Sequence, residues 1–322
     1  MGMDMAERVE AVLRDGGAPG FHGLVVRRGG QVVLERYGAG ADFRLGEPLG
    51  HVTFDRDTLH DLRSVSKSVV ALLYGIALGD GLVPEPGAGL MAQFPEYPDL
   101  AEDPGKAHLT IEHALTMTLG LDWNEDAPYT SPANSEIAME LAPDRYRYVL
   151  ERPVAEEAGK RWRYCGGATA LLGGVIAKGT GRPLERYAAE ALFGPLGITD
   201  FAWTRGPDGI ASAAAGLRLR PVDLAAVGQL VLDGGRGIVP EVWLEKALRS
   251  RVPIDGPFTY GYHWYVLAEE RRRVQAAGNG GQLLVVVPDE ELVVAVTAGE
   301  YDRDTGGSRA VLETVLEAVL EG

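Results

Sequence analysis

The chain has 322 residues, 46% of them hydrophobic, so it can bury a large core, and at about 150 residues per domain its length predicts two domains or one with a large insertion. Its formal net charge of −15 argues against nucleic-acid partners and membrane partners, because both kinds of anionic surface attract basic proteins. The N-terminus has no basic segment followed by an apolar core, and the sequence has no run of about 18 apolar residues. Cys165 is the single cysteine, so no internal disulfide can form. From these features we expect a cytoplasmic protein.

The first elements along the chain are a helix and a hairpin. Apolar residues at the helical period predict a helix that begins near residue 5 and ends at the Gly16-Gly17 turn. Strand-like runs at 23–28 and 31–37 flank Gly29-Gly30, a pair that tolerates positive φ at both turn positions. The glycine-containing stretch 38–59 has little periodicity and predicts loops with short strands.

A buried helix follows, predicted to begin near Ser64 and to end at Asp80-Gly81. Lys67 lies three residues after Ser64, so both side chains project from one face and form a candidate serine nucleophile with a lysine base. Lysine can take this role only if burial or nearby positive charge lowers its pKa, and we expect burial in a cleft to do so. The alternative is a serine N-cap followed by an exposed lysine.

Between residues 82 and 181 helical periods and loop signals dominate, which predicts a mainly helical region inserted between two parts of a sheet. Thr110 can cap a short helix that Gly120 would end. Segment 121–125, with Trp123, suits either a cleft wall or a surface loop. A further apolar stripe over 168–176 predicts another buried helix.

Strand signals return at 282–287 and 291–297, where two β-branched runs flank a tight turn. The last apolar stripe, over 311–319, predicts a helix that covers one sheet face beside the N-terminal helix.

Other chemical motifs are missing from the sequence. It contains no G-x-S-x-G elbow, phosphate-binding loop, H-E-x-x-H or C-x-x-C, and its six histidines have no ligand-like spacing, so we expect neither metal nor cofactor. Tyr164 opens a Y-C-G-G turn, and G-N-G-G at 278–281 precedes the strand that begins at Gln282. Glycines allow a ligand to approach the backbone closely, and the amide of Gln282 could face an oxyanion; each segment could equally be a simple turn.

Together these segments resemble the serine β-lactamase-like superfamily, which includes class C β-lactamases, penicillin-binding DD-peptidases, esterases and 6-aminohexanoate-oligomer hydrolases. The resemblance covers nearly the whole chain and rests on S-V-S-K at 64–67, L-T-I-E-H-A-L-T-M-T at 109–118 and G-K-R-W-R-Y at 159–164. It implies a β-lactamase/transpeptidase-like α/β (α+β) fold, with an antiparallel sheet flanked by terminal helices. Residues 1–81 with 182–322 would form the sheet lobe, 82–181 the helical lobe, and the active site would lie between them.

The resemblance also implies roles for individual residues. Ser64 would be the nucleophile, Lys67 its base, and Tyr164 a proton shuttle to the leaving group and from water. The backbone amides of Ser64 and Gln282 would form the oxyanion hole. The family's second motif, Tyr-x-Asn, begins at Tyr164, and its third, Lys/His-Thr/Gly-Gly, is assigned to Asn279-Gly280-Gly281.

Two departures from the family pattern bear on the substrate. Gly166 stands where β-lactam enzymes have an asparagine, and Asn279 stands where they have a cation. Because each loss removes a polar contact, we expect a wider cleft near Tyr164 and weak recognition of β-lactams.

We therefore expect a serine esterase or amidase acting on a small ester or amide, with Trp123, Gly166, Asn279, Gly280 and Gly281 at the substrate. The alternatives are a β-lactamase or DD-peptidase proper, a non-catalytic binding or scaffold protein, and an acyltransferase. The oligomeric state has no signature in the sequence.

Overall fold

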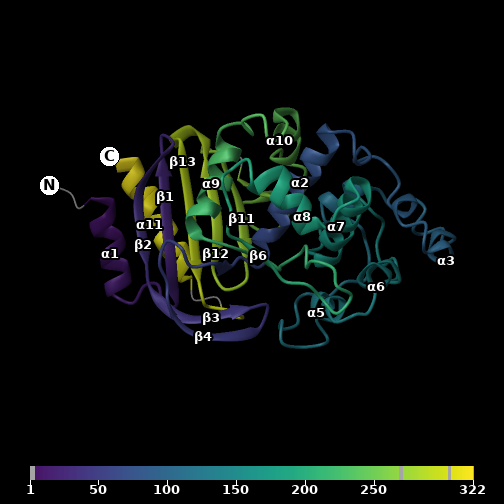
Figure 1. The fold of residues 1–322 in the computed structure, drawn as a ribbon, viewed down its shortest axis with the longest axis horizontal. Helices are drawn as coiled ribbons and strands as arrows, with labels where there is room; N and C mark the ends of the chain where they lie inside the picture. The colour runs from purple at the N-terminus through teal and green to yellow at the C-terminus, as the bar shows by residue number, and fades with distance from the viewer. Residues whose placement is uncertain (1–3, 268–270, 304–305, 322) are drawn as a thin grey trace.

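The computed structural model describes residues 4–267, 271–303 and 306–321 (Figure 1). The N-terminal part contains α1 (Met5–Arg14), β1 (Phe21–Arg28), β2 (Gln31–Tyr37), β3 (Ala39–Arg44), β4 (Glu47–Thr53), β5 (His60–Asp61) and α2 (Val65–Gly79). A mainly helical part contains η1 (Met91–Gln93), α3 (Pro98–Ala101), α4 (Ile111–Leu115), α5 (Ser135–Glu140), α6 (Arg145–Leu150), α7 (Gly166–Thr180), α8 (Leu184–Ala188) and η2 (Ala189–Phe193). The C-terminal part contains β6 (Ala202–Trp203), β7 (Leu217–Leu219), α9 (Pro221–Leu232), α10 (Glu241–Ala247), β8 (Val252–Pro253), β9 (Thr259–Tyr260), β10 (Tyr265–Leu267), β11 (Arg273–Gly278), β12 (Gln282–Val287), η3 (Pro288–Glu290), β13 (Leu292–Ala298) and α11 (Gly307–Glu321).

The main sheet is antiparallel, with strand order β2-β1-β13-β12-β11-β10-β9-β8. Two small sheets, β3-β4 and β5-β7-β6, lie outside it. The N-terminal strand β1 lies beside the C-terminal strand β13, where Val25 of β1 and Leu284 of β12 both pair with Ala295 of β13. The antiparallel sheet predicted from the sequence is therefore confirmed.

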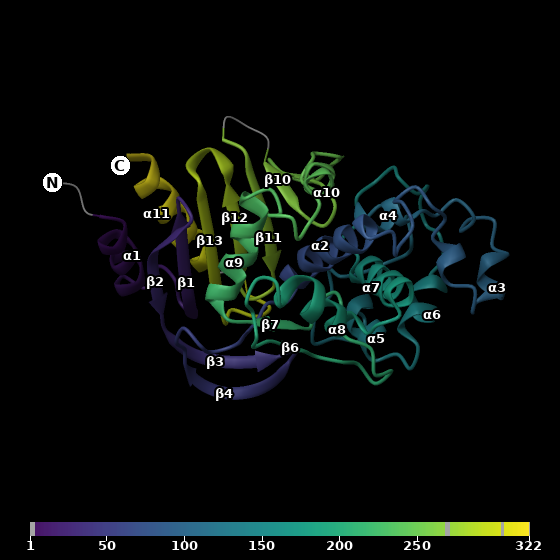
Figure 2. The ribbon, with the colours of Figure 1, turned by 45° about the horizontal axis from the view of Figure 1, so that its top comes forward.

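Strand β13 is buried on both faces, and its side chains alternate between two cores. Val294 and Val296 face α1 and α11, whereas Val293 and Ala295 face the core that contains α9 and α2. This alternation follows from the two-residue period of a strand. Helices α1 and α11 thus cover one face, and α9 covers the other (Figure 2). The predicted flanking of the sheet by terminal helices is confirmed.

Helix α2 joins the sheet to the helical part. Thirteen of its fifteen residues are buried, as expected for a helix inside a core rather than on a surface. It packs against β11 at the sheet and against α7 among the helices. A single cluster of buried side chains runs through both parts, from Val25 of β1 to Leu171 of α7. Ser64, at the start of α2, is thereby held in a rigid framework.

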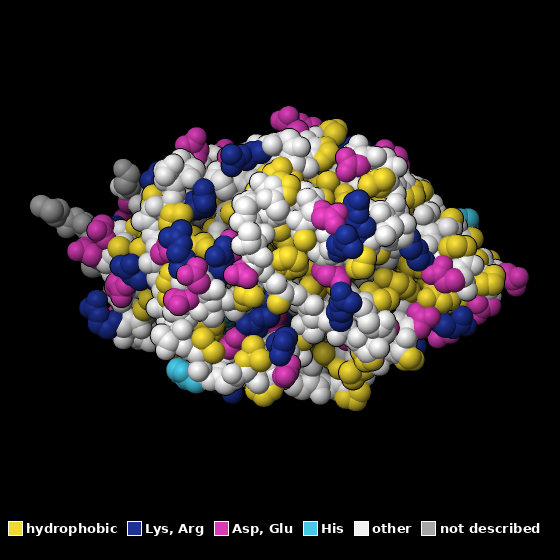
Figure 3. All heavy atoms as spheres, in the orientation of Figure 1, with side chains coloured by type: hydrophobic (Ala, Val, Ile, Leu, Met, Phe, Trp, Pro, Cys, Tyr) yellow, Lys and Arg dark blue, Asp and Glu magenta, His cyan; other side chains and the backbone are white. Residues whose placement is uncertain are grey.

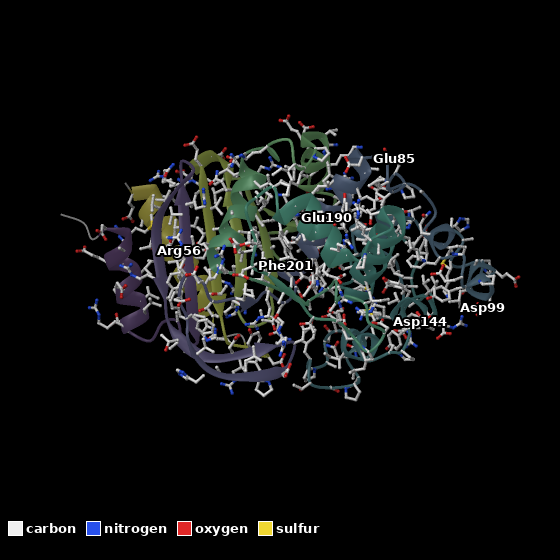
Figure 4. All side chains as sticks on the ribbon, viewed as in Figure 1. Arg56, Glu85, Asp99, Asp144, Glu190 and Phe201 are labelled. Atoms are coloured by element: carbon white, nitrogen blue, oxygen red, sulfur yellow. The ribbon has the colours of Figure 1, made fainter. Side chains whose placement is uncertain are left out.

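Side chains fill the space between the two parts of the ribbon (Figure 4). Arg56 lies at the sheet end of the molecule in this view, and Asp99 and Asp144 at the helical end. Between them, Phe201 contacts Phe193 of η2, with ring centres 4.8 Å apart. The division into lobes at 82–181 stays a prediction.

Several local expectations are confirmed. The first hairpin turns at Gly29 and Gly30, both with positive φ. Thr110 caps α4, although α4 ends before Gly120, at Leu115. Of the loops with short strands expected over 38–59, the strands are present as β3 and β4, which pair along their length as a separate hairpin. Among the described residues, no helix has the length and apolar character needed to cross a membrane.

Candidate active site

The backbone before α2 positions Ser64. Arg63 has a φ of 47°, a conformation that costs a non-glycine residue about 1–3 kcal/mol and needs support from its surroundings. Asp61 gives that support through an ion pair to Arg63 Nε at 3.1 Å, and the guanidinium also stacks 4.5 Å from the ring centre of Tyr301. The bend places Ser64 at the N-cap of α2 with no capping hydrogen bond of its own, so its hydroxyl is available for other contacts.

Lys67 lies one turn into α2 and is almost completely buried, at 1% exposure. Its Nζ donates to Ser64 Oγ at 3.0 Å, to the backbone oxygen of Ala214 at 3.0 Å and to Glu136 Oε2 at 3.1 Å. An ammonium group has three N–H donors, and here each has an acceptor. This arrangement suits a protonated lysine. The predicted pairing of Ser64 with Lys67 is present in the structure.

The expected lowering of the lysine pKa is wrong. Burial alone would lower the pKa of Lys67, but the carboxylate of Glu136 outweighs it, with help from Glu125, so the pKa is raised above its usual value. Lys67 is therefore the cation of a buried ion pair with Glu136, whose side chain is 4% exposed. Because Lys67 is already protonated, it can accept the Ser64 proton only if it gives up one of its own.

Tyr164 lies on the other side of the ammonium, with its ring centre 4.8 Å from Lys67 Nζ. Burial raises the pKa of Tyr164 well above its usual value, as do Tyr265 and the carboxyls of Glu125 and Glu136, while a hydrogen bond to Ser64 acts in the opposite direction. The phenol is therefore neutral near pH 7 and can donate a proton.

Glu136 occupies the space beside Gly166. A β-carbon built on Gly166 would overlap Glu136 Oε2, so any larger residue there would displace the carboxylate. The prediction of a wider cleft at this position is wrong, because the side chain that Gly166 lacks is replaced by one from α5. Helix α5 is fixed at its start by Asn134, whose side-chain oxygen accepts the amides of Glu136 and Ile137.

A second acidic residue, Glu125, lies at the N-terminus of α7. Its carboxylate accepts the Gly166 amide at 2.5 Å, Trp123 Nε1 at 2.6 Å and the Tyr129 hydroxyl at 2.9 Å. Burial and the neighbouring Glu136 raise the pKa of Glu125 to about 7, against the opposing effect of Lys67. Trp123, buried at 2% exposure, lines the cavity beside this carboxylate.

Strand β11 forms the opposite side of the site. A β-carbon on Gly278, its last residue, would lie 2.5 Å from Leu62 O and 3.1 Å from Ser64 N, so only glycine allows this approach. Asn279, the next residue, has its side chain turned to the loop after β13, where it bonds with Asp302. Among the residues that the structure describes, the backbone amides of Ser64 and Asn279 have no hydrogen-bond partner.

The structure places Gln282 away from the predicted oxyanion hole. It opens β12, one strand farther from α2, opposite Gly278, and its side chain bonds to the backbone of Ala298. Gly280 and Gly281 form the turn between the strands, with φ of 92° and 90°. The physical reason is that the chain reverses there, so the strand beside Ser64 ends before Asn279-Gly280-Gly281 rather than containing it.

A cavity of about 610 Å³ opens next to these groups. Trp123, Glu125 and Tyr164 line it, together with Asp126 and residues 160–163 and 253–255. Across the described ranges, no cluster of His, Cys, Asp or Glu side chains has a metal-binding arrangement.

Comparison with known proteins agrees with this geometry. The family model described as Beta-lactamase matches residues 5–315. The chain belongs to the Beta-lactamase family. Its S-V-S-K segment at 64–67 lies within the matched residues.

Two curated relatives of the chain are named as a hydrolase and an esterase. The chain is 26% identical over 294 residues to a 6-aminohexanoate-dimer hydrolase of Paenarthrobacter ureafaciens, covering 83% of this chain and 68% of the relative. It is 29% identical over 210 residues to esterase EstB of Burkholderia gladioli, covering 61% of this chain and half, 51%, of the relative. The solved structure of EstCE1, described as a hydrolase with promiscuous acyltransferase activity, superposes with a TM-score of 0.78 at 18% identity over 98% of both chains. The β-lactamase/transpeptidase-like fold is confirmed.

Sequence reasoning found part of this family site. The structure brings Ser64, Lys67 and Tyr164 together, and Trp123 lines the same cavity as Tyr164. Glu136 was missed, because S-E-I-A-M-E at 135–140 carries no motif. Glu125 lies in segment 121–125, for which the sequence left a cleft wall and a surface loop open, and its role as a hydrogen-bond acceptor at the start of α7 was also missed.

Proposed function

We propose that this protein is a serine esterase or amidase that forms an acyl-enzyme on Ser64 and hydrolyses a small ester or amide. The observation that carries the proposal is the 3.0 Å contact between Lys67 Nζ and Ser64 Oγ, next to Tyr164, which lines a cavity. The names of the curated relatives, a 6-aminohexanoate-dimer hydrolase and an esterase, support the same reaction class.

In the proposed cycle, Ser64 Oγ attacks the carbonyl carbon as its proton passes to the Lys67 side of the site. The free backbone amides of Ser64 and Asn279 would stabilise the oxyanion; for the second donor we favour Asn279 over Gln282, because Gly278 brings the end of β11 against Ser64. The neutral Tyr164 phenol would protonate the leaving alcohol or amine. Water would then enter, attack the acyl-enzyme and return Ser64 to its free form.

The substrate preference follows from the groups beside Lys67. Gly166 offers no side-chain amide, and the carboxylate of Glu136 fills that space. If Gly278 ends the third motif, the position of the family's cation falls on Ala276, a buried residue, rather than on Asn279. We therefore propose that neutral esters and amides are turned over well and β-lactams slowly or not at all.

The proposal is tested with a fluorophosphonate probe and with p-nitrophenyl acetate. Intact-protein mass should give one adduct on the wild type and none on Ser64→Ala, because the nucleophile is removed without disturbing the fold. kcat/KM for the ester should exceed that for nitrocefin at least a hundredfold, in line with two lost polar contacts at about 1.4 kcal/mol per tenfold. An unlabelled wild type, or equal labelling of Ser64→Ala, would instead support a non-catalytic binding protein.

Acyl transfer is a second candidate, because the same acyl-enzyme can meet an acceptor other than water. The description of EstCE1 as a hydrolase with promiscuous acyltransferase activity supports this candidate. Adding an alcohol acceptor to the ester assay and measuring the transfer product separates the two outcomes.

A further inference from the structure

The contacts around Lys67 give Glu136 a place in the reaction. Of the three acceptors of the Nζ protons, Ser64 Oγ is the attacking atom and Ala214 O is a backbone carbonyl, so Glu136 is the one that can take up a proton. Ser64 and Glu136 are thus joined through a single nitrogen, at 3.0 and 3.1 Å.

Space in the site is arranged around this carboxylate. Gly166 leaves room for Glu136 Oε2 that any β-carbon would remove, and Asn134 and Asn124 hold the start of α5 in place. Glu136 is 3% exposed, so it is withdrawn from water and its charge is balanced within the site. Among the residues that the structure describes, Lys67 is the one side chain recorded in a hydrogen bond or ion pair with the Glu136 carboxylate. Such a pair is hard to explain by stability alone, since buried ion pairs seldom add net stability.

We propose that Glu136 is the proton acceptor behind Lys67, so that Ser64, Lys67 and Glu136 act as one relay. When Ser64 Oγ bonds to the carbonyl carbon, its proton moves to Lys67 Nζ, and a different proton moves from Nζ to Glu136 Oε2. The ammonium is thereby retained beside the oxyanion, and the carboxyl becomes neutral. When the leaving group departs with a proton from Tyr164, the proton on Glu136 returns through Lys67 to the phenolate, and the ion pair is restored.

The raised pKa of Lys67 agrees with this relay, since an ammonium paired with a carboxylate cannot by itself remove a proton at neutral pH. Other ionisable groups affect the same carboxylate, and the test has to separate them. Those that interact electrostatically with Glu136 or its lysine partner are Glu125, Tyr129, Glu140, Tyr164, Cys165, Tyr260, His263 and Tyr265. Among them, Glu125 has a pKa of about 7 and titrates in the range of the assay.

The relay rests on the proposed function and is tested by pH–rate profiles of acylation for the wild type, Glu136→Gln and Glu136→Asp. We expect Glu136→Gln to acylate at least a hundredfold more slowly at pH 7, the scale of general-base catalysis, and its acid limb to move by more than about one pH unit to higher pH. The limb moves because Lys67 must then lose its own proton before it can accept one from Ser64. Glu136→Asp, which keeps the carboxylate, should recover part of the rate with the limb near its wild-type position.

Glu140→Gln is the matched control. Glu140 lies one turn farther along α5, bonds to Ser212 and pairs with Arg145, and makes no contact with Lys67 among the contacts that the structure describes. Its substitution should leave the rate within about threefold, and the acid limb within about 0.3 pH units, of the wild type. Thermal unfolding of each variant establishes that it is folded.

Gly166→Ala provides a second route to the same contact if Glu136→Gln does not fold. Its β-carbon displaces the carboxylate without removing it, so the acid limb should again move to higher pH. If a folded Glu136→Gln or Gly166→Ala variant kept the wild-type acylation rate and acid limb, the relay would be wrong. It would also be wrong if the acid limb of the pH–rate profile moved in Glu125→Gln and in neither of these two variants. Labelling of Ser64 in the wild type would still stand in those cases, so failure of the relay is distinct from failure of the proposed function.

Discussion

At the residue scale, Lys67 has a structural role as well as its proposed catalytic one. It is buried with Glu136, and each is the other's counter-ion. From the sequence, Lys67 is a base in a cleft whose removal affects chemistry alone. The ion pair adds a second consequence, because removal of the cation leaves a carboxylate buried without a partner.

Lys67→Met should therefore lower the free energy of unfolding by about 3–5 kcal/mol at pH 7, the usual cost of breaking a buried pair from one side. Lys67→Met combined with Glu136→Gln should regain most of this loss, because the unpaired charge is then removed as well. Urea unfolding of the two variants and the wild type measures both values. Equal stability of Lys67→Met and the wild type would contradict the buried pair.

At the scale of the element, strand β11 sets the geometry of the candidate active site next to Ser64. It ends at Gly278, against Leu62 and Ser64, and its hairpin with β12 turns at residues 279–281. Most of its residues are small or polar, R-V-Q-A-A-G, and the absence of alternating β-branched residues explains why the sequence did not predict it. The strand forms because it pairs with β12 and β10 in the middle of the sheet, although its own residues have a weak strand preference.

Gly278→Ala should push the end of β11 away from α2 and move the Asn279 amide from the proposed oxyanion position. We expect acylation of Ser64 to fall at least tenfold, since losing one oxyanion donor costs about 10²–10³ in rate and a displacement costs part of that. Gly87→Ala is the control, because a β-carbon there meets no atom within 4 Å. Similar acylation rates for the two variants would argue against the role of β11.

At the scale of the whole molecule, the surface charge and the buried charge behave differently. The face in Figure 3 has acidic and basic side chains interspersed, so the net charge of −15 forms no single acidic patch there. The unusual ionisable groups lie inside. Burial lowers the pKa of His263 to about 3, with a further contribution from Lys67, and burial also lowers the pKa of His22 to about 4.

His263 gives a prediction for stability against pH. Its folded pKa lies below the unfolded value of about 6.5, so its contribution is fully present above pH 6.5 and is lost as the pH falls from there toward 3, because the unfolded chain takes up the proton first. His263→Asn removes this titration, and asparagine tolerates the φ of 59°. Between pH 7 and pH 4.5 the variant should lose about 2 kcal/mol less stability than the wild type.

Chemical denaturation at the two pH values measures this difference. The wild-type curve alone is insufficient, because burial raises the pKa values of Glu125 and Glu140 and these carboxyls act in the opposite direction. His108→Asn, at an exposed position, serves as the control and should follow the wild type. If His263→Asn and the wild type lost the same free energy of unfolding between pH 7 and pH 4.5, the buried imidazole would not remain neutral over this range.

The sequence by itself determined the elements whose signal is local. Ser64 and Lys67 share one helix and differ by three residues, so helical geometry alone puts them together. The strands at 282–287 and 292–298 and the terminal helices were predictable from their apolar periods. Tyr164 came from the family motif, which is also contained in a short segment.

Only the tertiary structure decided the surroundings of that pair. Glu136 is 69 residues from Lys67, and no local pattern relates the two. Gly166 looked like the loss of a binding group, yet its missing side chain makes room for a carboxylate from another helix. The choice between Asn279 and Gln282 depends on where β11 ends against α2, and therefore on long-range packing. The electrostatics of Lys67 depend on all of these contacts, since burial and a neighbouring carboxylate shift a pKa in opposite directions and only their distances determine which prevails.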